Sequence, residues 1–169
     1  MRTIDDINGL GDADFVTMLA GIYESSPWVA EAGCVLRPFA SRQELAATLQ
    51  SVVEDAPEAT QMELIRVHPD LGGKLAREGN LTEESMREQS RHGLDRLTDE
   101  EFERFTALNH SYRERFGFPF IICVGLVDRE GILRSFEERL EHSPEEERVE
   151  ALRQIHLIAG LRLAELVKA

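Results

Sequence analysis

Apolar side chains recur at intervals of three and four residues along most of the chain, the spacing that puts them on one face of a helix. Residues 42–53 show this pattern, and Ser41 with Glu44 forms a capping box in front of them. The apolar face of this predicted helix consists of Leu45, Leu49 and Val52. We expect that face to be buried.

Start and stop signals predict four further helices. They run from Pro57 to just before Pro69, from Thr82 to about Leu97, from Thr98 to about Gly117, and from Ser143 to about Val167. Two of them have a glutamate three residues after the capping residue, as a capping box requires. Gly117 can end its helix in a left-handed turn.

Residues 118–127 are rich in β-branched and aromatic side chains, which would suit a strand, but no partner strand is evident elsewhere. We therefore expect a buried irregular segment that leads into a helix. The chain then has an all-α fold, with residues 1–169 as a single domain that is a bundle of about seven or eight helices.

Composition and charge narrow the classes of partner. A length of 169 residues, with 42% hydrophobic and 30% charged residues, is typical of one globular domain. No apolar run approaches the roughly 20 residues of a membrane span, and no secretory signal is visible, so we expect a cytoplasmic protein. The net charge of −13 repels nucleic acid and anionic membranes, so we expect neither as a partner. A site for an anionic substrate would then need a local cation.

Familiar cofactor and metal motifs do not occur in the sequence. It has no phosphate-binding glycine loop, dinucleotide fingerprint or nucleophile elbow, and its five histidines lack metal-ligand spacing. Cys34 and Cys123 are far apart, and we expect both to be buried small hydrophobic residues. An enzyme with this sequence would use acid, base and hydrogen-bond chemistry without a metal or another cofactor.

Three polar positions could carry such chemistry. His68 stands at a helix end before a proline that disfavours helical geometry, and imidazole exchanges protons near neutral pH; alternatively, it only stabilises the helix end, which the pattern alone favours. Ser85, Glu88 and His92 share one helix face, although such a stripe is more often solvated. Arg162 interrupts an apolar face, where it must pair with a carboxylate, reach solvent or bind an anion.

A fourth feature lies after the predicted helix that ends near Gly117. Asn109, Tyr112 and residues 116–120 form an aromatic patch whose backbone, outside any helix, has N–H and C=O groups to offer a ligand. A hydrophobic loop that closes the core is an equally good interpretation.

Together these segments resemble the family of 2-oxo-4-hydroxy-4-carboxy-5-ureidoimidazoline (OHCU) decarboxylases. The matching motifs keep their order and span nearly the whole chain. They are Ser26-Pro27-Trp28-Val29, Arg37-Pro38-Phe39, His68-Pro69-Asp70-Leu71-Gly72-Gly73-Lys74, Leu81-Thr82 with Ser85-x-x-Glu88-Gln89, Gly93-Leu94-Asp95, Asn109-x-x-Tyr112-x-x-x-Phe116-Gly117-Phe118-Pro119-Phe120-Ile121, and Ile158-Ala159-x-Leu161-Arg162-Leu163.

The resemblance implies a cofactor-free, homodimeric enzyme that converts OHCU to (S)-allantoin and CO2, the last of three steps from urate. It implies that His68, Glu88 and Arg162 are the catalytic residues. The residues that it implies for binding the ureido-imidazoline are Pro69, Ser85, Met86, Arg87, Glu88, Gln89, Phe120, Ile121, Ile122, Cys123 and Val124. We expect the three catalytic side chains to meet in one pocket beside residues 120–124.

One departure from the family pattern leaves alternatives open. Arg91 and His92 stand where small residues are expected, and His92 would share the face of Glu88 and alter the edge of the pocket. A related decarboxylase for a different ureido acid is therefore one alternative. A non-catalytic helical module that uses its acidic surface or residues 116–120 to hold a partner protein is another.

Overall fold

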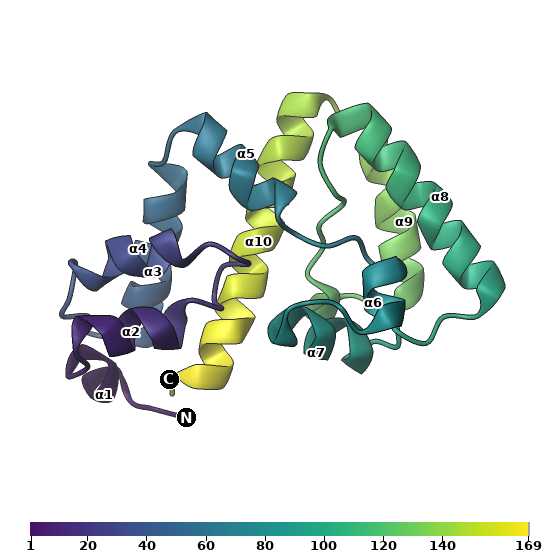
Figure 1. The fold of residues 1–169 in the computed structure, drawn as a ribbon. Helices are drawn as coiled ribbons and strands as arrows, with labels where there is room; N and C mark the ends of the chain where they lie inside the picture. The colour runs from purple at the N-terminus through teal and green to yellow at the C-terminus, as the bar shows by residue number, and fades with distance from the viewer. Residues whose placement is uncertain (169) are drawn as a thin grey trace. The chain divides into compact units, whose positions relative to one another are not determined.

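The computed structural model describes residues 1–168, which form ten α-helices and one 3-10 helix (Figure 1). The elements are α1 (Ile4–Asn8), α2 (Asp12–Leu19), α3 (Pro27–Cys34), α4 (Arg42–Glu54), α5 (Glu58–Arg66), α6 (Lys74–Glu78), α7 (Glu83–Arg91), α8 (Asp99–Phe116), η1 (Val124–Leu126), α9 (Arg129–Arg139) and α10 (Pro144–Leu166). The all-α class is confirmed. The helices α1 and α6 have five residues each, too few for hydrophobic periodicity to reveal them.

The chain divides into two compact units. Unit 1 contains residues 1–64 and the chain from His156 onward, and unit 2 contains residues 65–155. Two helices, α5 and α10, contribute residues to both units. That the whole chain is one domain stays a prediction.

In unit 1, α2 packs against α3 and α3 packs against α4. The contact between α3 and α4 is close because Gly33 has no side chain: a Cβ there would lie 2.6 Å from Cδ2 of Leu49. Leu45 and Leu49 of α4 are buried as predicted. Val53 completes the buried face and Val52 is only half-buried, so the prediction was wrong by one residue at the end of this helix.

The last helix, α10, buries a face that differs in part from the prediction. Ile155 and Arg162 are buried, but Ile158 is half-buried and Leu166 is 38% exposed. Ala159 and Leu163 are the other core residues of this stretch.

The two ends of the described chain pair within unit 1. The N–H of Arg2 donates to the C=O of Leu166 at 2.8 Å, and the N–H of Lys168 donates to the C=O of Arg2 at 2.8 Å. This bridge ties the N-terminal segment to the end of α10 (Figure 1).

Unit 2 follows the capping signals in the sequence. Thr98 and Glu101 form the predicted capping box of α8, and Gly117 ends that helix with a φ of +75°. The predicted helix from Thr82 to about Leu97 was wrong at its end, since α7 stops at Arg91. Gly93 follows with a φ of +70°, and the N–H of the next residue reaches back to the C=O of Gln89 at 2.9 Å, a Schellman turn that prevents continuation.

An aromatic cluster forms the centre of unit 2. Tyr112 is fully buried and contacts four phenylalanine rings, those of Phe116, Phe118, Phe120 and Phe136. The rings of Phe120 and Phe136 stack with their centroids 3.7 Å apart. Residues 118–123 are buried without forming a helix or strand, and η1 and α9 follow, which confirms the irregular segment predicted there.

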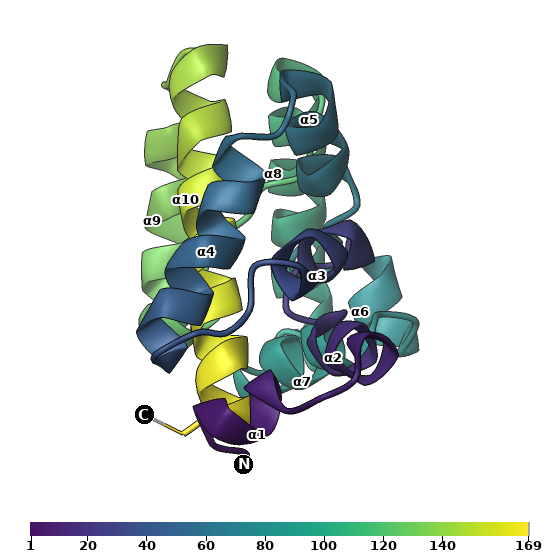
Figure 2. The same cartoon turned by 90° about the vertical axis from the view of Figure 1, so that its left-hand side faces the viewer.

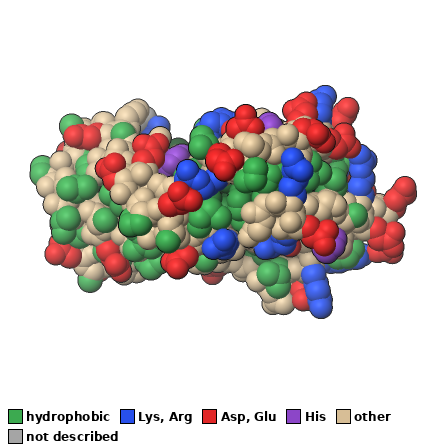
Figure 3. Space-filling view, turned by 90° about the horizontal axis from the view of Figure 1, so that it is seen from above, with side chains coloured by type: hydrophobic (Ala, Val, Ile, Leu, Met, Phe, Trp, Pro, Cys, Tyr) green, Lys and Arg blue, Asp and Glu red, His purple; other side chains and the backbone are tan. Residues whose placement is uncertain are grey.

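The surface carries both signs of charge. On the face shown in Figure 3, acidic side chains are spread widely, with lysine and arginine side chains between them. Among residues 1–168, no helix is long and apolar enough to cross a membrane.

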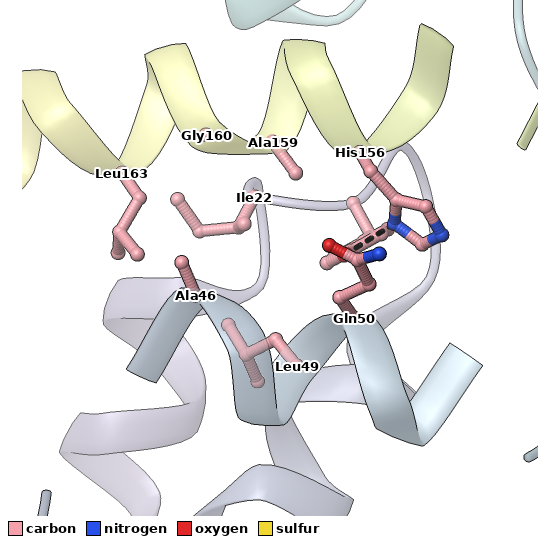
Figure 4. Close-up of a pocket in the computed structure, with 9 residues that line it drawn as sticks. Ile22, Ala46, Leu49, Gln50, His156, Ala159, Gly160 and Leu163 are labelled. Atoms are coloured by element: carbon pink, nitrogen blue, oxygen red, sulfur yellow. Dashed lines mark hydrogen bonds between the residues drawn. The ribbon is translucent and has the colours of Figure 1, made fainter. Parts of the chain in front are cut away.

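A pocket of about 40 Å³ lies between α4 and the C-terminal part of α10, which run side by side in both ribbon views (Figures 1, 2 and 4). His156 borders it, and its Nδ1 lies 3.0 Å from the hydroxyl of Tyr23. Its Nε2 is buried, has no hydrogen-bond partner among the described residues and lies 4.0 Å from Oε1 of Glu54. Burial lowers the pKa of His156, an effect that the Glu54 carboxylate opposes.

Two glycine substitutions should have opposite effects on stability. A Cβ at Gly117 or at Gly160 would meet no atom within 4 Å, so the two positions differ mainly in backbone conformation. Gly117→Ala should lower the free energy of unfolding by about 1 kcal/mol, since an alanine is strained at positive φ. Gly160→Ala, within α10, should raise it by roughly 0.5–1 kcal/mol. Urea unfolding measures both free-energy changes. Changes of the same sign would contradict the left-handed conformation of Gly117 or the helical conformation of Gly160.

Replacing His156 with glutamine should flatten the pH dependence of stability. Because its pKa is lowered on folding, the unfolded chain binds a proton that the folded chain does not as the pH falls below about 6.5. The free energy of unfolding of the natural protein should therefore decrease between about pH 7 and pH 5, and His156→Gln should lose less over the same interval. The matched control is His110→Gln, at an exposed position on α8. Equal slopes in His156→Gln and the natural protein would argue against this role.

Candidate functional site

Residues 68–73 form a largely buried turn of unit 2, and Lys74 begins α6. The preceding helix, α5, ends at Arg66, earlier than predicted, and Val67 is exposed rather than part of an apolar helix face. His68 is 6% exposed, and its N–H donates to the C=O of Ile65 at 3.3 Å. Its imidazole is therefore held largely away from solvent, where a proton transfer is shielded from competing water.

Two side-chain amides hold this turn in place. The side chain of Gln89 on α7 accepts the N–H of Gly72 at 3.0 Å and donates to the C=O of Asp70 at 3.2 Å. Asn109 on α8 donates to the C=O of Leu71 at 2.9 Å. Both amides are buried, so the turn that follows His68 is fixed by hydrogen bonds from two helices.

Gly72 is required at the centre of the turn. Its φ is +56°, a conformation that favours glycine. A Cβ at this position would also lie 2.6 Å from Cδ1 of Leu97 and 3.3 Å from Cδ1 of Phe105. The glycine pair of the sequence motif thus lets the turn approach the apolar core closely.

The helix α7 presents its polar residues unevenly. Ser85 and Gln89 are buried, Met86 and Glu88 are half-buried, and Arg87 is exposed. A purely solvated face, the alternative for this stripe, does not describe the helix. His92 is the C-cap of the helix rather than part of its body, and its alignment with Glu88 on one face stays a prediction.

The two predicted substrate-binding segments of unit 2 are neighbours. The helix α7, which carries residues 85–89, packs against η1, whose first residue is Val124. Unit 2 therefore brings together the turn after His68, the helix of Glu88 and the end of the 120–124 segment. That these segments bind a substrate stays a prediction.

Side chains that the sequence did not single out hold residues 120–124. Arg139 of α9 donates from Nη1 to the C=O of Ile121 at 2.6 Å, and Gln154 of α10 accepts the N–H of Cys123 at 2.8 Å. No sequence motif marks these two residues, because their partners are backbone groups far along the chain.

Arg139 is itself fixed by a fully buried carboxylate, that of Glu147. Nε of Arg139 lies 2.6 Å from Oε1 of Glu147, and the hydroxyl of Tyr112 donates to the same oxygen. Nδ1 of His142 lies 2.9 Å from the other oxygen. Burial raises the pKa of Tyr112 well above its ordinary value, and its hydrogen bond to Glu147 adds to the rise, so the phenol stays protonated and donates.

Arg162 belongs to unit 1. Its guanidinium donates to the C=O of Gly21 at 2.9 Å and to the carboxylate of Glu24 at 3.0 Å, and both charged side chains are buried. Pairing with a protein carboxylate, one of the alternatives for this arginine, therefore occurs. No motif in the sequence pointed to Glu24. The meeting of His68, Glu88 and Arg162 in one pocket stays a prediction.

The polar groups predicted for the site, taken unit by unit, suit acid–base and hydrogen-bond chemistry. They comprise a buried imidazole, a half-buried carboxylate, a paired guanidinium and irregular backbone. Among residues 1–168, no group of three histidine, cysteine, aspartate or glutamate side chains could hold a metal ion. Cys34 and Cys123 are both buried, as expected.

Comparison with known proteins supports one family. The family model of OHCU decarboxylases matches residues 8–164. The chain is 43% identical to the 2-oxo-4-hydroxy-4-carboxy-5-ureidoimidazoline decarboxylase of Haloferax volcanii, over 96% of this chain and 95% of that protein. It is 40% identical to the protein of the same name from Halalkalicoccus jeotgali, over 97% of this chain and 91% of that protein.

The fold of the chain is also similar to that of a solved structure. The crystal structure of an (S)-allantoin synthase superposes with a TM-score of 0.78 at 32% identity, over 99% of this chain and 54% of that one, so this chain spans about half of its length. The buried His68 turn, the neighbouring segments of unit 2 and these similarities lead to one conclusion: the chain belongs to the OHCU decarboxylase family.

Proposed function

We propose that this protein decarboxylates OHCU to (S)-allantoin and CO2. The observation that carries the proposal is the family match over residues 8–164, which includes the turn of His68 and the helix of Glu88. The geometry of unit 2 supports it, because this turn is tied to the helix through Gln89. The family match gives no support to a non-catalytic interaction module.

The substrate can accept its own electron pair. When the bond between the ring carbon and the carboxylate breaks, its electrons form a double bond to the neighbouring imine carbon, and the imine nitrogen takes up a proton. The ring hydroxyl then loses its proton as that neighbouring carbon gains one, which gives the carbonyl and the stereocentre of allantoin. The protein has to orient the substrate and place protons, so we propose that it needs no cofactor.

Each catalytic residue has a distinct task in this proposal. His68, acting with Glu88, hydrogen-bonds the ring hydroxyl and manages its proton, since an imidazole exchanges protons near neutral pH. Arg162 supplies the local positive charge that an anionic substrate needs in a protein with a net charge of −13. The carboxylate of Glu24 offsets part of this charge, but the pairing fixes the guanidinium in one orientation, which supports a role for Arg162 in orienting the substrate.

The substrate contacts in the proposal involve both side chains and backbone. Pro69, residues 85–89 and residues 120–124 would surround the ureido-imidazoline. Support comes from the packing of α7 against η1 and from the burial of Ser85 and Gln89. Delivery of the final proton to a single face of the ring would give the S configuration.

The proposal extends to the state of the protein in the cell. We expect a homodimer in the cytoplasm, with the small-molecule substrate and product as its ligands. Family resemblance supports the dimer, and two buried cysteines that form no disulfide suit a reducing compartment. Light scattering of the purified chain tests the dimer directly.

Replacing His68 with asparagine should lower kcat for OHCU by at least roughly 100-fold, because a neutral amide cannot exchange the proton. OHCU is generated in situ, and the appearance of (S)-allantoin is followed by circular dichroism. Far-ultraviolet circular dichroism should show unchanged helix content.

His110→Asn is the matched control, since that side chain is exposed on α8, and it should keep full activity. A fully active His68→Asn protein would remove His68 from the mechanism. Failure of the natural protein to accelerate the reaction, or to favour one enantiomer, would overturn the proposed function.

A further inference from the structure

Two buried side chains flank Ile122 from opposite ends of its backbone. Arg139 donates to the C=O of Ile121 at 2.6 Å, and Gln154 accepts the N–H of Cys123 at 2.8 Å. Their side chains come from α9 and α10, and both residues are less than 10% exposed. Neither contact touches a polar group of Ile122 itself.

The planarity of the peptide bond makes these contacts act on Ile122. The C=O of Ile121 and the N–H of Ile122 belong to one planar unit, in which they point in opposite directions when the bond is trans. Arg139 therefore aims the N–H of Ile122 by holding the other end of that unit. In the same way, Gln154 aims the C=O of Ile122 by holding the N–H of Cys123.

The two aimed groups have no hydrogen-bond partner in unit 2, all of whose residues the structure describes. By contrast, the C=O of Cys123 is used by the N–H of Leu126 at 3.0 Å. Ile122 is only 6% exposed, and buried backbone polar groups are nearly always paired. One donor and one acceptor of a single residue are thus left for another partner.

Both side chains are anchored at their far ends. Arg139 is bound to the carboxylate of Glu147, and its guanidinium lies 4.4 Å from the ring centroid of Phe120. Gln154 donates from Nε2 to the carboxylate of Glu150 at 2.7 Å. Anchored side chains hold the peptide planes with little freedom, which reduces the entropy cost of binding a ligand.

We propose that Arg139 and Gln154 are positioning residues that orient the N–H and C=O of Ile122 as a donor–acceptor pair for the amide-like groups of the substrate. A ureido group and a ring amide each carry an N–H and a C=O, which match such a pair. The inference rests on the proposed function, and it assigns Arg139 to the backbone rather than to the substrate carboxylate.

Gln154→Met tests the inference because methionine keeps the length of the side chain but cannot accept the N–H of Cys123. Bonds to a backbone group that orients the ligand act equally in the ground and transition states, so their loss should raise KM and leave kcat nearly unchanged. We expect KM for OHCU and Kd for (S)-allantoin to rise roughly threefold to tenfold, the effect of about one hydrogen bond.

A double variant should restore the KM for OHCU, which a purely structural role of Gln154 would not predict. In Gln154→Glu with Glu150→Gln, the carboxylate at 154 still accepts the N–H of Cys123, and the bond between positions 150 and 154 is restored with donor and acceptor exchanged. KM should return to within about twofold of the natural value. The control is Arg104→Lys at an exposed ion pair, which should leave KM and kcat unchanged.

Three outcomes separate the hypotheses. If Gln154→Met is folded and active with an unchanged KM, or if its KM rises and the double variant does not restore it, the positioning role is wrong while the proposed function stands. If the natural protein neither turns over OHCU nor binds (S)-allantoin, the proposed function fails and this inference fails with it. If Gln154→Met does not fold, Arg139→Lys provides the same comparison, because a lysine cannot hold Glu147 and Ile121 together.

Discussion

The buried carboxylate of Glu147 organises unit 2. A charge that is fully excluded from solvent must be compensated by a cation and by hydrogen bonds, and Arg139, Tyr112 and His142 provide them. These four residues join α8, α9, the turn that follows α9 and the start of α10. Because Arg139 has a further N–H to give, the same ion pair also fixes the backbone at Ile121.

Buried side-chain amides also hold irregular backbone in place, both in the turn after His68 and in residues 120–124. Gln89 and Asn109 satisfy backbone groups of the turn after His68, just as Gln154 satisfies the N–H of Cys123. Buried backbone outside helices would otherwise carry unpaired polar groups at a high free-energy cost. Helices that are fixed by their own hydrogen bonds thus hold two non-helical segments, and it is these segments that carry His68 and the predicted substrate-binding backbone.

This arrangement fits a reaction whose substrate provides its own electron sink. In such a reaction the protein has to orient the substrate, transfer protons and compensate the negative charge of the substrate. Peptide groups held by anchored side chains are well suited to orientation because they do not reorganise when a ligand arrives. In the proposed function, the backbone orients the substrate and the buried imidazole of His68 transfers the proton.

The sequence by itself determined the elements whose causes are local. Capping residues and helical periodicity predicted α4, α8 and α10 because a cap and its glutamate lie three residues apart. The wrong end of α7 was also a local matter, since Gly93 is the terminating signal and it was present in the sequence. The family motifs singled out His68, Glu88 and Arg162 as the predicted catalytic residues, and the irregular segment after Gly117 was predicted from its composition.

Only the tertiary structure decided which side chains hold the irregular segments. Arg139 and Gln154 bind backbone groups 18 and 31 residues away, and Arg162 pairs with Glu24 across 138 residues. A backbone N–H or C=O is present at nearly every position and leaves no trace in the identity of the residue that carries it. A side chain that binds such a group therefore looks in the sequence like any other polar residue on a helix, and its partner becomes visible only when the chain is folded.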